Sequence, residues 1–211
     1  MASSTTARSG AAGARGGTKG VARGEREEQI LAVAGAVFGE QGYAATSVAD
    51  IAARAGISKP LIYNYFGSKD GLFERVVGEA AALIVTEIER SARLGAVGVE
   101  RGLVTLDGVF GVLEGRIWTW QVVNDPTAPT TGSIATVQDA CRRRLEELAA
   151  EGVGELLRLA GVTDPLDVEA MTAVWGQVFA TLVTWWTQHP DVTREQMTAR
   201  CVRLFDAVLA R

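Results

Sequence analysis

Residues 38–73 read FGEQGYAATSVADIAARAGISKPLIYNYFGSKDGLF, and this stretch decides the fold of the N-terminal part of the chain. Ser47, followed by Asp50 three residues later, closely matches a capping box, with Asp in place of Glu, and predicts the start of a short helix. Gly56 supplies a turn, and Ser58 is a second N-cap that opens another short helix. Two short helices joined by a glycine-containing turn indicate a helix-turn-helix.

Small and aliphatic residues suit the crossing of these two helices. Ala52 and Gly56 lie four residues apart and remove side-chain bulk where the second helix must cross the first. Ile51, Ile57 and Ile62 can then fill the small core between them. An ordinary helical hairpin would satisfy the same spacing, so this element alone leaves both interpretations open.

The longer string closely resembles the DNA-binding signature of the TetR family (tetracycline-repressor-like regulators). The matching features are Phe and Gly-Tyr ending a first helix, Thr-Ser opening the second, Ile-Ala-x-x-Ala-Gly at the turn, and a Tyr-x-Tyr-Phe-x-x-Lys run. The resemblance covers residues 28–77. It implies an all-α fold class: an N-terminal three-helix helix-turn-helix DNA-binding domain and a C-terminal helical ligand-binding and dimerisation domain.

Composition divides the chain into three parts. Residues 1–23 are rich in Gly, Ala, Ser and Thr, contain four basic residues and no acid, and predict a disordered basic arm. Such an arm either contacts DNA or is a solvated tail, and the sequence does not decide between the two. We expect residues 24–80 to form the helix-turn-helix domain. Residues 81–211, which carry helical patterns and no strand signal, are expected to form the effector-binding and dimerisation domain.

The second short helix predicts a surface that contacts DNA. Ile62 and Phe66, four residues apart, should point inward, which leaves the outward arc near the helix N-terminus for base edges. Asn64 can pair with adenine and Lys59 can reach guanine, while tyrosine hydroxyls and Lys69 suit phosphates. The resemblance implies that Lys59, Pro60, Leu61 and Asn64 face bases and that Thr46, Tyr63, Tyr65 and Lys69 contact the backbone. The predicted DNA-binding residues are Thr46, Ser58, Lys59, Pro60, Leu61, Tyr63, Asn64, Tyr65 and Lys69. Half-buried packing is the alternative for both tyrosines.

Two strongly apolar helical patterns end the chain, around residues 171–186 and 197–209. Such a pair either covers its own core or meets a partner, and periodicity alone leaves both possibilities open. The TetR resemblance implies a four-helix dimer interface. The predicted interface residues are Val178, Leu182, Trp185, Met197, Cys201, Leu204, Phe205 and Val208.

Five aromatic residues of the region 81–211 are candidates for lining a small-molecule pocket. They are Phe110, Trp118, Trp120, Trp175 and Phe179. Packing in the core is the alternative for each of them. Trp118 and Trp120 lie two residues apart, so on a helix they would point in different directions.

Composition also bears on what the chain is not. It has 211 residues, 47% hydrophobic and 22% charged, with one histidine, His189, and two cysteines without CxxC spacing. A histidine zinc triad is therefore excluded, and neither a metal nor a cofactor is expected. No apolar run reaches the roughly 20 residues that span a bilayer, and no secretory signal is recognisable, so we expect a cytoplasmic protein.

These observations together predict a non-enzymatic, homodimeric DNA-binding transcriptional regulator. We expect a repressor that binds a near-palindromic double-stranded operator and is released by a small apolar or aromatic effector. Two alternatives stay open: a constitutive or partner-controlled DNA-binding protein without an effector, and a small-molecule-converting enzyme, which the lone His189 and the absence of convergent titratable groups disfavour.

Overall fold

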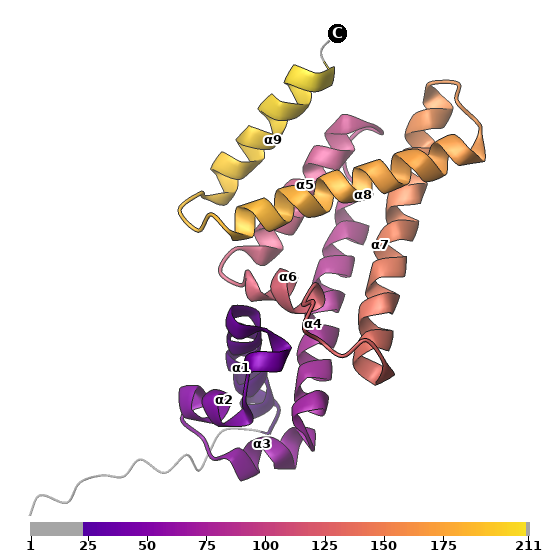
Figure 1. The fold of residues 1–211 in the computed structure, drawn as a ribbon. Helices are drawn as coiled ribbons and strands as arrows, with labels where there is room; N and C mark the ends of the chain where they lie inside the picture. The colour runs from indigo at the N-terminus through magenta and orange to yellow at the C-terminus, as the bar shows by residue number, and fades with distance from the viewer. Residues whose placement is uncertain (1–22, 210–211) are drawn as a thin grey trace, which may run out of the picture.

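The computed structural model describes residues 23–209, and this part of the chain is all-helical, without a strand (Figure 1). The helices are α1 (Arg23–Ala45), α2 (Val48–Ala55), α3 (Lys59–Phe66), α4 (Lys69–Ser91), α5 (Val99–Leu113), α6 (Trp118–Val123), α7 (Gly132–Leu159), α8 (Pro165–Thr187) and α9 (Arg194–Leu209). The expected all-α class is confirmed. The basic arm predicted for residues 1–23 lies outside the described residues, except for Arg23, which begins α1.

Local signals in the quoted stretch place the first four helices. Ser47 accepts a hydrogen bond from the Asp50 amide, and the Asp50 carboxylate accepts one from the Ser47 amide, so the predicted capping box is present. Gly56 ends α2 in the left-handed conformation, at φ 65°. Ser68 caps α4 by accepting from the Gly71 amide, whereas Ser58 stands at the N-cap of α3 without a side-chain bond.

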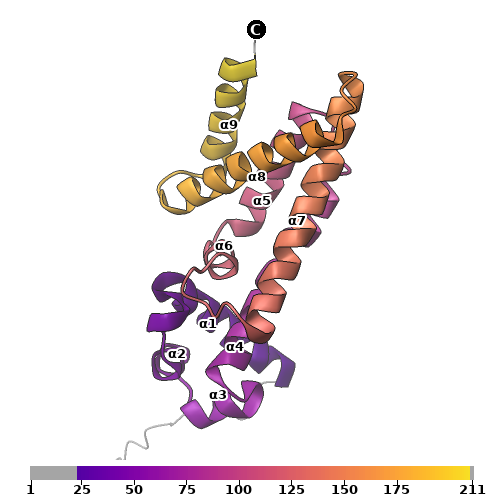
Figure 2. The ribbon, with the colours of Figure 1, turned by 45° about the vertical axis from the view of Figure 1, so that its right-hand side comes forward.

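The helix α4 connects the two parts of the molecule. It leaves the α1–α3 cluster and runs without a break into the body, where it packs against α5, α6 and α7 (Figures 1 and 2). The expected domain boundary at residues 80 and 81 therefore falls inside one continuous helix. In both views α7 runs beside α4, α8 crosses them near the top, and α9 packs on α5.

One hydrophobic core extends through both parts. Near α3 it contains Phe38, Ile62 and Phe73, and in the body it contains Leu106 and Phe110, all of them buried. The edge-to-face contact of Phe38 with Phe73, with ring centroids 4.7 Å apart, joins α1 to α4. Packing of this kind fixes α3 relative to α4.

The segment after α6 also holds α1. The Asp125 carboxylate accepts a hydrogen bond from the Tyr43 amide, at 2.5 Å, and the Thr127 hydroxyl accepts one from the Ala44 amide, at 3.1 Å. Both bonds fall at the end of α1, where Gly42 leaves helical geometry at φ 77°. The loop that follows α6 thus binds the end of α1.

Candidate DNA-binding surface and ligand cavity

The helix α3 has one buried side and one open side. Ile62 is fully buried, as predicted, and Phe66 packs partly buried against the same core. Leu61 is half-buried. Exposed side chains occupy the outward arc: Ser58, Lys59, Pro60, Tyr63 and Asn64. This exposed side carries amide, ammonium and phenol donors, the groups that read base edges and hold phosphates.

Thr46 was predicted to contact the DNA backbone, which requires an exposed side chain, but the structure buries it. Its side chain is only 3% exposed, and its hydroxyl donates to the Gly42 carbonyl at 2.8 Å. Its amide donates to the same oxygen at 3.2 Å. Thr46 thus satisfies the Gly42 carbonyl with both its amide and its hydroxyl, and its side chain is turned toward the end of α1.

Lys69 belongs to a small cluster at the start of α4. Its ammonium lies 4.2 Å from the centre of the Tyr43 ring, within cation–π range. The Tyr43 hydroxyl donates to the Asp70 carboxylate at 2.6 Å, and this bond raises the Tyr43 pKa to about 12. Tyr43 thus contacts both Lys69 and Asp70 at the α4 N-terminus, where the helix amides favour an anion.

Arg23 stands beside the predicted reading surface. Its guanidinium carbon lies 5.3 Å from the centre of the Tyr65 ring, so a half-buried tyrosine carries an arginine on its face. The sequence analysis included Arg23 in the basic arm, for which contact with DNA and a solvated tail both stayed open. No local pattern pairs the first residue of α1 with α3, because their contact depends on tertiary packing. By contrast, Arg54 forms two bonds to the Glu40 carboxylate, which offsets its charge.

A large cavity lies in the body between α4, α5, α7 and α8, with a volume of about 1010 Å³. Trp120, Trp175 and Phe179 line it, together with Leu145 and Val153 of α7. The Trp120 indole N–H donates to the Thr184 hydroxyl at 3.1 Å. Three of the five aromatic residues expected in a pocket therefore share one cavity.

Phe110 and Trp118 do not line this cavity, contrary to expectation. Phe110 is fully buried against Trp186, with ring centroids 5.0 Å apart, because the apolar side of α5 turns into the core. Trp118 points the opposite way from Trp120 and packs on α1 beside Gly35 and Gly39. The two-residue spacing on α6 separates the two indoles, as the sequence suggested.

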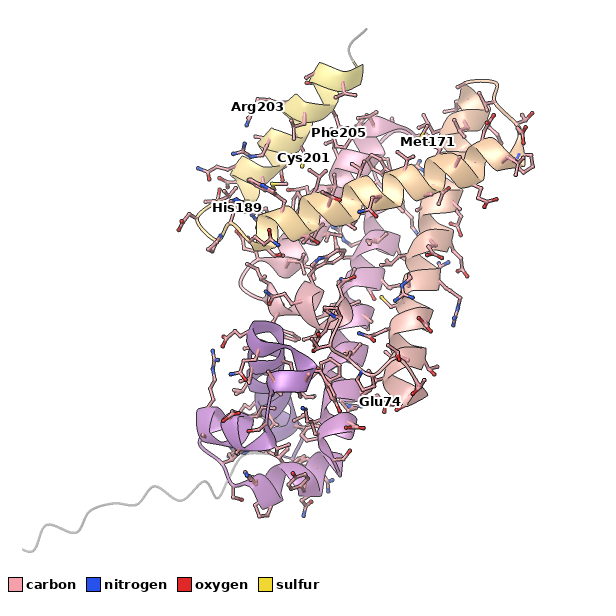
Figure 3. The ribbon with its side chains drawn as sticks, viewed as in Figure 1. Glu74, Met171, His189, Cys201, Arg203 and Phe205 are labelled. Carbon is pink, nitrogen blue, oxygen red and sulfur yellow. The ribbon has the colours of Figure 1, made fainter. Side chains whose placement is uncertain are left out.

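The predicted interface residues of α8 and α9 fall into two groups. Met197 and Cys201 are fully buried within the protomer, so they form no outer surface; they lie on the side of α9 that packs against α5. Leu204 and Val208 are exposed, whereas Val178, Leu182, Trp185 and Phe205 are half-buried. Cys201 and Phe205 appear with Met171 of α8 in Figure 3.

Other apolar residues, which were not among the predicted interface residues, are also exposed on these helices. They are Leu166, Met171 and Val174 of α8 and Val202 of α9. Helical spacing identifies an apolar side but not which part of a strongly apolar helix faces the core. Burial raises the pKa of the Cys141 and Cys201 thiols, so both stay neutral and pack as small apolar side chains.

Two further searches cover only the described residues. Among residues 23–209 no group of three or more His, Cys, Asp or Glu side chains is arranged to hold a metal ion. No helix in that range combines the length and the apolar character needed to cross a membrane.

Residues 30–76 match the model of the family described as bacterial regulatory proteins, tetR family. The chain is also similar to the HTH-type transcriptional activator FasR of Mycolicibacterium smegmatis, with 28% identity over 138 residues. That match covers 63% of this chain and 62% of FasR, so the chain spans about three fifths of this relative.

Solved structures share the fold over most of the chain. A TetR-like transcriptional regulator from Rhodococcus sp. RHA1 is 27% identical, with a TM-score of 0.62, over 87% of this chain and 97% of that one. AibR, solved in complex with isovaleryl coenzyme A and operator DNA, is 21% identical, with a TM-score of 0.69, over 85% of this chain and 97% of AibR.

Proposed function

We propose that this chain, whose residues 30–76 match the tetR family model, is a homodimeric repressor of that family and that it leaves its DNA operator when a small molecule binds in the body. The observation that carries the proposal is the exposed side of α3. Lys59, Tyr63 and Asn64 are free to meet a duplex, while Ile62 anchors the helix to the core.

Recognition would place α3 in the major groove. Asn64 can make two hydrogen bonds to adenine, and Lys59 can donate to guanine. Lys69 and the tyrosines would hold phosphates on either side. Two protomers related by a twofold axis would then read half-sites roughly 34–36 Å apart or somewhat more, which accounts for a near-palindromic operator.

A second copy of the chain would cover the exposed apolar residues of α8 and α9. Val174 of α8 is 57% exposed and Val208 of α9 is 74% exposed, although Val183 and Cys201 of the same two helices are fully buried. Large apolar side chains exposed on two helices of one protomer are typical of an interaction surface. The twofold arrangement required by a palindromic operator fits an isologous contact between identical surfaces.

The cavity supports a small-molecule effector. AibR, which has a similar fold, was solved with an acyl coenzyme A and with operator DNA. An effector can release DNA only if it binds one arrangement of the protein more tightly than the other. A swing from nearly all bound to nearly all released needs about a 10⁴-fold difference in affinity.

Selection of bound fragments from genomic or random DNA with the purified protein tests the proposal. We expect a near-palindromic consensus. Asn64→Ala should cost about 1–3 kcal/mol on that sequence and little on random DNA. Gln188→Ala, which removes an exposed amide at the end of α8, is the matched control and should leave both affinities unchanged.

Equal losses on selected and random DNA would contradict base reading by Asn64. The direction of regulation is tested separately with a reporter gene placed behind the selected site. Repression in the presence of the protein supports the proposal, and activation, the role for which FasR is named, would replace that part of it.

A further inference from the structure

The cavity has strongly apolar walls with a charged group among them. Trp175 packs directly on α5 because Gly102 has no side chain: a Cβ atom there would come 2.7 Å from Cζ2 of the indole. Phe179, Leu145 and Val153 continue the apolar wall. At about 1010 Å³ the cavity is at the upper end of ligand sites, large enough for an extended chain.

Arg101, the residue before Gly102, lines the same cavity. Its side chain is only 22% exposed, and Nη1 of its guanidinium donates a hydrogen bond to the Glu155 carboxylate. Its Nε is buried, and no residue between 23 and 209 bonds to it. Guanidinium groups bind carboxylates and phosphates through two parallel N–H donors, and the edge formed by Nε and Nη2 is such a pair.

The neutral polar groups around the cavity already have partners within the protein. The Trp120 indole donates to Thr184. The Thr105 hydroxyl donates to the Arg101 carbonyl at 2.9 Å, and the Thr172 hydroxyl donates to the Val168 carbonyl at 2.7 Å. The Arg101 guanidinium therefore stands out in this wall as a charged group with more N–H donors than its bond to Glu155 uses.

The other charged residues along the cavity stand in water. Glu146, Glu147, Glu169 and Arg142 are all exposed at its rim. Arg142 bonds to Asp139, and Glu147 to Arg144, so two of the four are paired. Screening by solvent weakens the effect of such exposed charges on a group held inside, whereas the largely buried guanidinium acts at short range.

We propose that the effector is an amphipathic anion whose acidic group binds the Arg101 guanidinium and whose apolar chain lies along Trp175 and Phe179. This inference rests on the proposed function, in which the cavity holds the effector. A carboxylate and a phosphate share the required chemistry, since each offers two oxygens to the guanidinium.

Four probes with the same ten-carbon chain test the inference: decanoate, decyl phosphate, decanol and decyltrimethylammonium. Binding to the full chain is measured by calorimetry below the concentration at which each probe forms micelles. We expect one or both anions to bind at least about tenfold more tightly than decanol and the cation. The two anions compared with each other identify the acidic group.

Two variants break the same ion pair and have opposite consequences. Arg101→Gln removes the proposed anchor and should weaken the anion at least about tenfold, to the level of decanol. Glu155→Gln leaves the guanidinium without its carboxylate and should keep or strengthen anion binding. Arg101→Lys, which retains the charge without the planar fork, should fall between them.

Equal binding of all four probes, tighter binding of the cation, absence of binding, or the same loss in Glu155→Gln as in Arg101→Gln would each overturn the inference. Binding of the selected operator without probe is measured for every variant. Operator binding reports on the fold and on the proposed DNA-binding function. A failure of the effector inference is therefore distinguishable from a failure of that function.

Discussion

Trp118 of α6 occupies the space that Gly35 leaves on α1: a Cβ atom at Gly35 would lie 2.5 Å from Cε3 of the indole. Gly39, one turn later, is equally close, with a Cβ atom 2.6 Å from Cβ of Trp118. Two residues further on, Trp120 lines the cavity. The six-residue helix α6 therefore packs on α1 through one indole and contributes the other indole to the cavity wall.

Gly35→Ala should destabilise the protein by about 1–3 kcal/mol, because the added methyl group overpacks a closed contact. Gly78→Ala is the matched control: Gly78 lies in α4 with nothing within 4 Å of an added Cβ, so alanine there should stabilise by about 0.4–1 kcal/mol. Urea unfolding measures both. Small and equal changes in the free energy of unfolding of the two variants would show that the Trp118 side chain can shift to make room for the added methyl group.

Lys69→Gln should weaken binding to selected and random DNA alike. Each phosphate contact that is lost flattens the dependence of log K on log salt by about one unit, or roughly two units for a dimer. Affinity measured between low and moderate salt gives the slope. Arg54→Gln is the comparison, since its charge is already offset by Glu40; a larger change of slope there would reverse the assignment.

Val174→Glu should dissociate the proposed dimer, because it places charges inside an apolar contact. Analytical ultracentrifugation of the variant should show one protomer where the unaltered chain shows two, with a corresponding loss of operator binding. Leu83→Glu changes an apolar residue of α4 that is also exposed, at 37%, and should leave the dimer intact. A dimeric Val174→Glu variant would place the interface elsewhere.

The Asp107 carboxylate ties α5 to α9. It accepts from Arg194 Nη2 at 2.6 Å and from the Thr198 hydroxyl at 2.8 Å, and the Arg194 bond lowers the Asp107 pKa below its ordinary value. Because the pKa is lowered in the folded protein, the ionised carboxylate contributes its whole stabilisation above the ordinary pKa of an aspartate, near 4. That contribution is lost as the pH falls through the pKa of the folded state.

Asp107→Asn should therefore destabilise the protein at pH 7 by about 0.5–1 kcal/mol, a modest effect since both partners are 37% exposed and solvent screens the pair. The difference from the unaltered chain should shrink as the pH is lowered toward 3. Asp139→Asn, in an exposed pair within α7, is the control and should have little effect at either pH. A difference independent of pH would assign the loss to packing.

The sequence predicted the α2–α3 element well because its signals are local. Ser47, Asp50 and Gly56 act within a few residues of themselves, and Ile62 is assigned inward by a spacing of four. The start of α8 at Asp164 and Pro165 is local in the same way, since Asp164 caps the Leu166 amide. Such features do not depend on the rest of the fold.

Other features depend on which helices meet, and a single sequence does not contain that information. Trp118 and Trp120 are equally aromatic, yet one packs on α1 and the other lines the cavity. Met197 and Leu204 share a helical period, yet one is buried and the other exposed. The Arg101–Glu155 pair joins residues 54 positions apart, which no local motif indicates.

The unbroken course of α4 gives the molecule a lever. Its 23 residues extend about 35 Å, since each residue of an α-helix rises about 1.5 Å. Tilting a rod of that length by only 5° moves its tip by about 3 Å, close to the 3.4 Å that separates neighbouring nucleotides along a DNA strand. A tilt of α4 by about 5° would therefore displace α3 from its half-site by almost the spacing of one base pair.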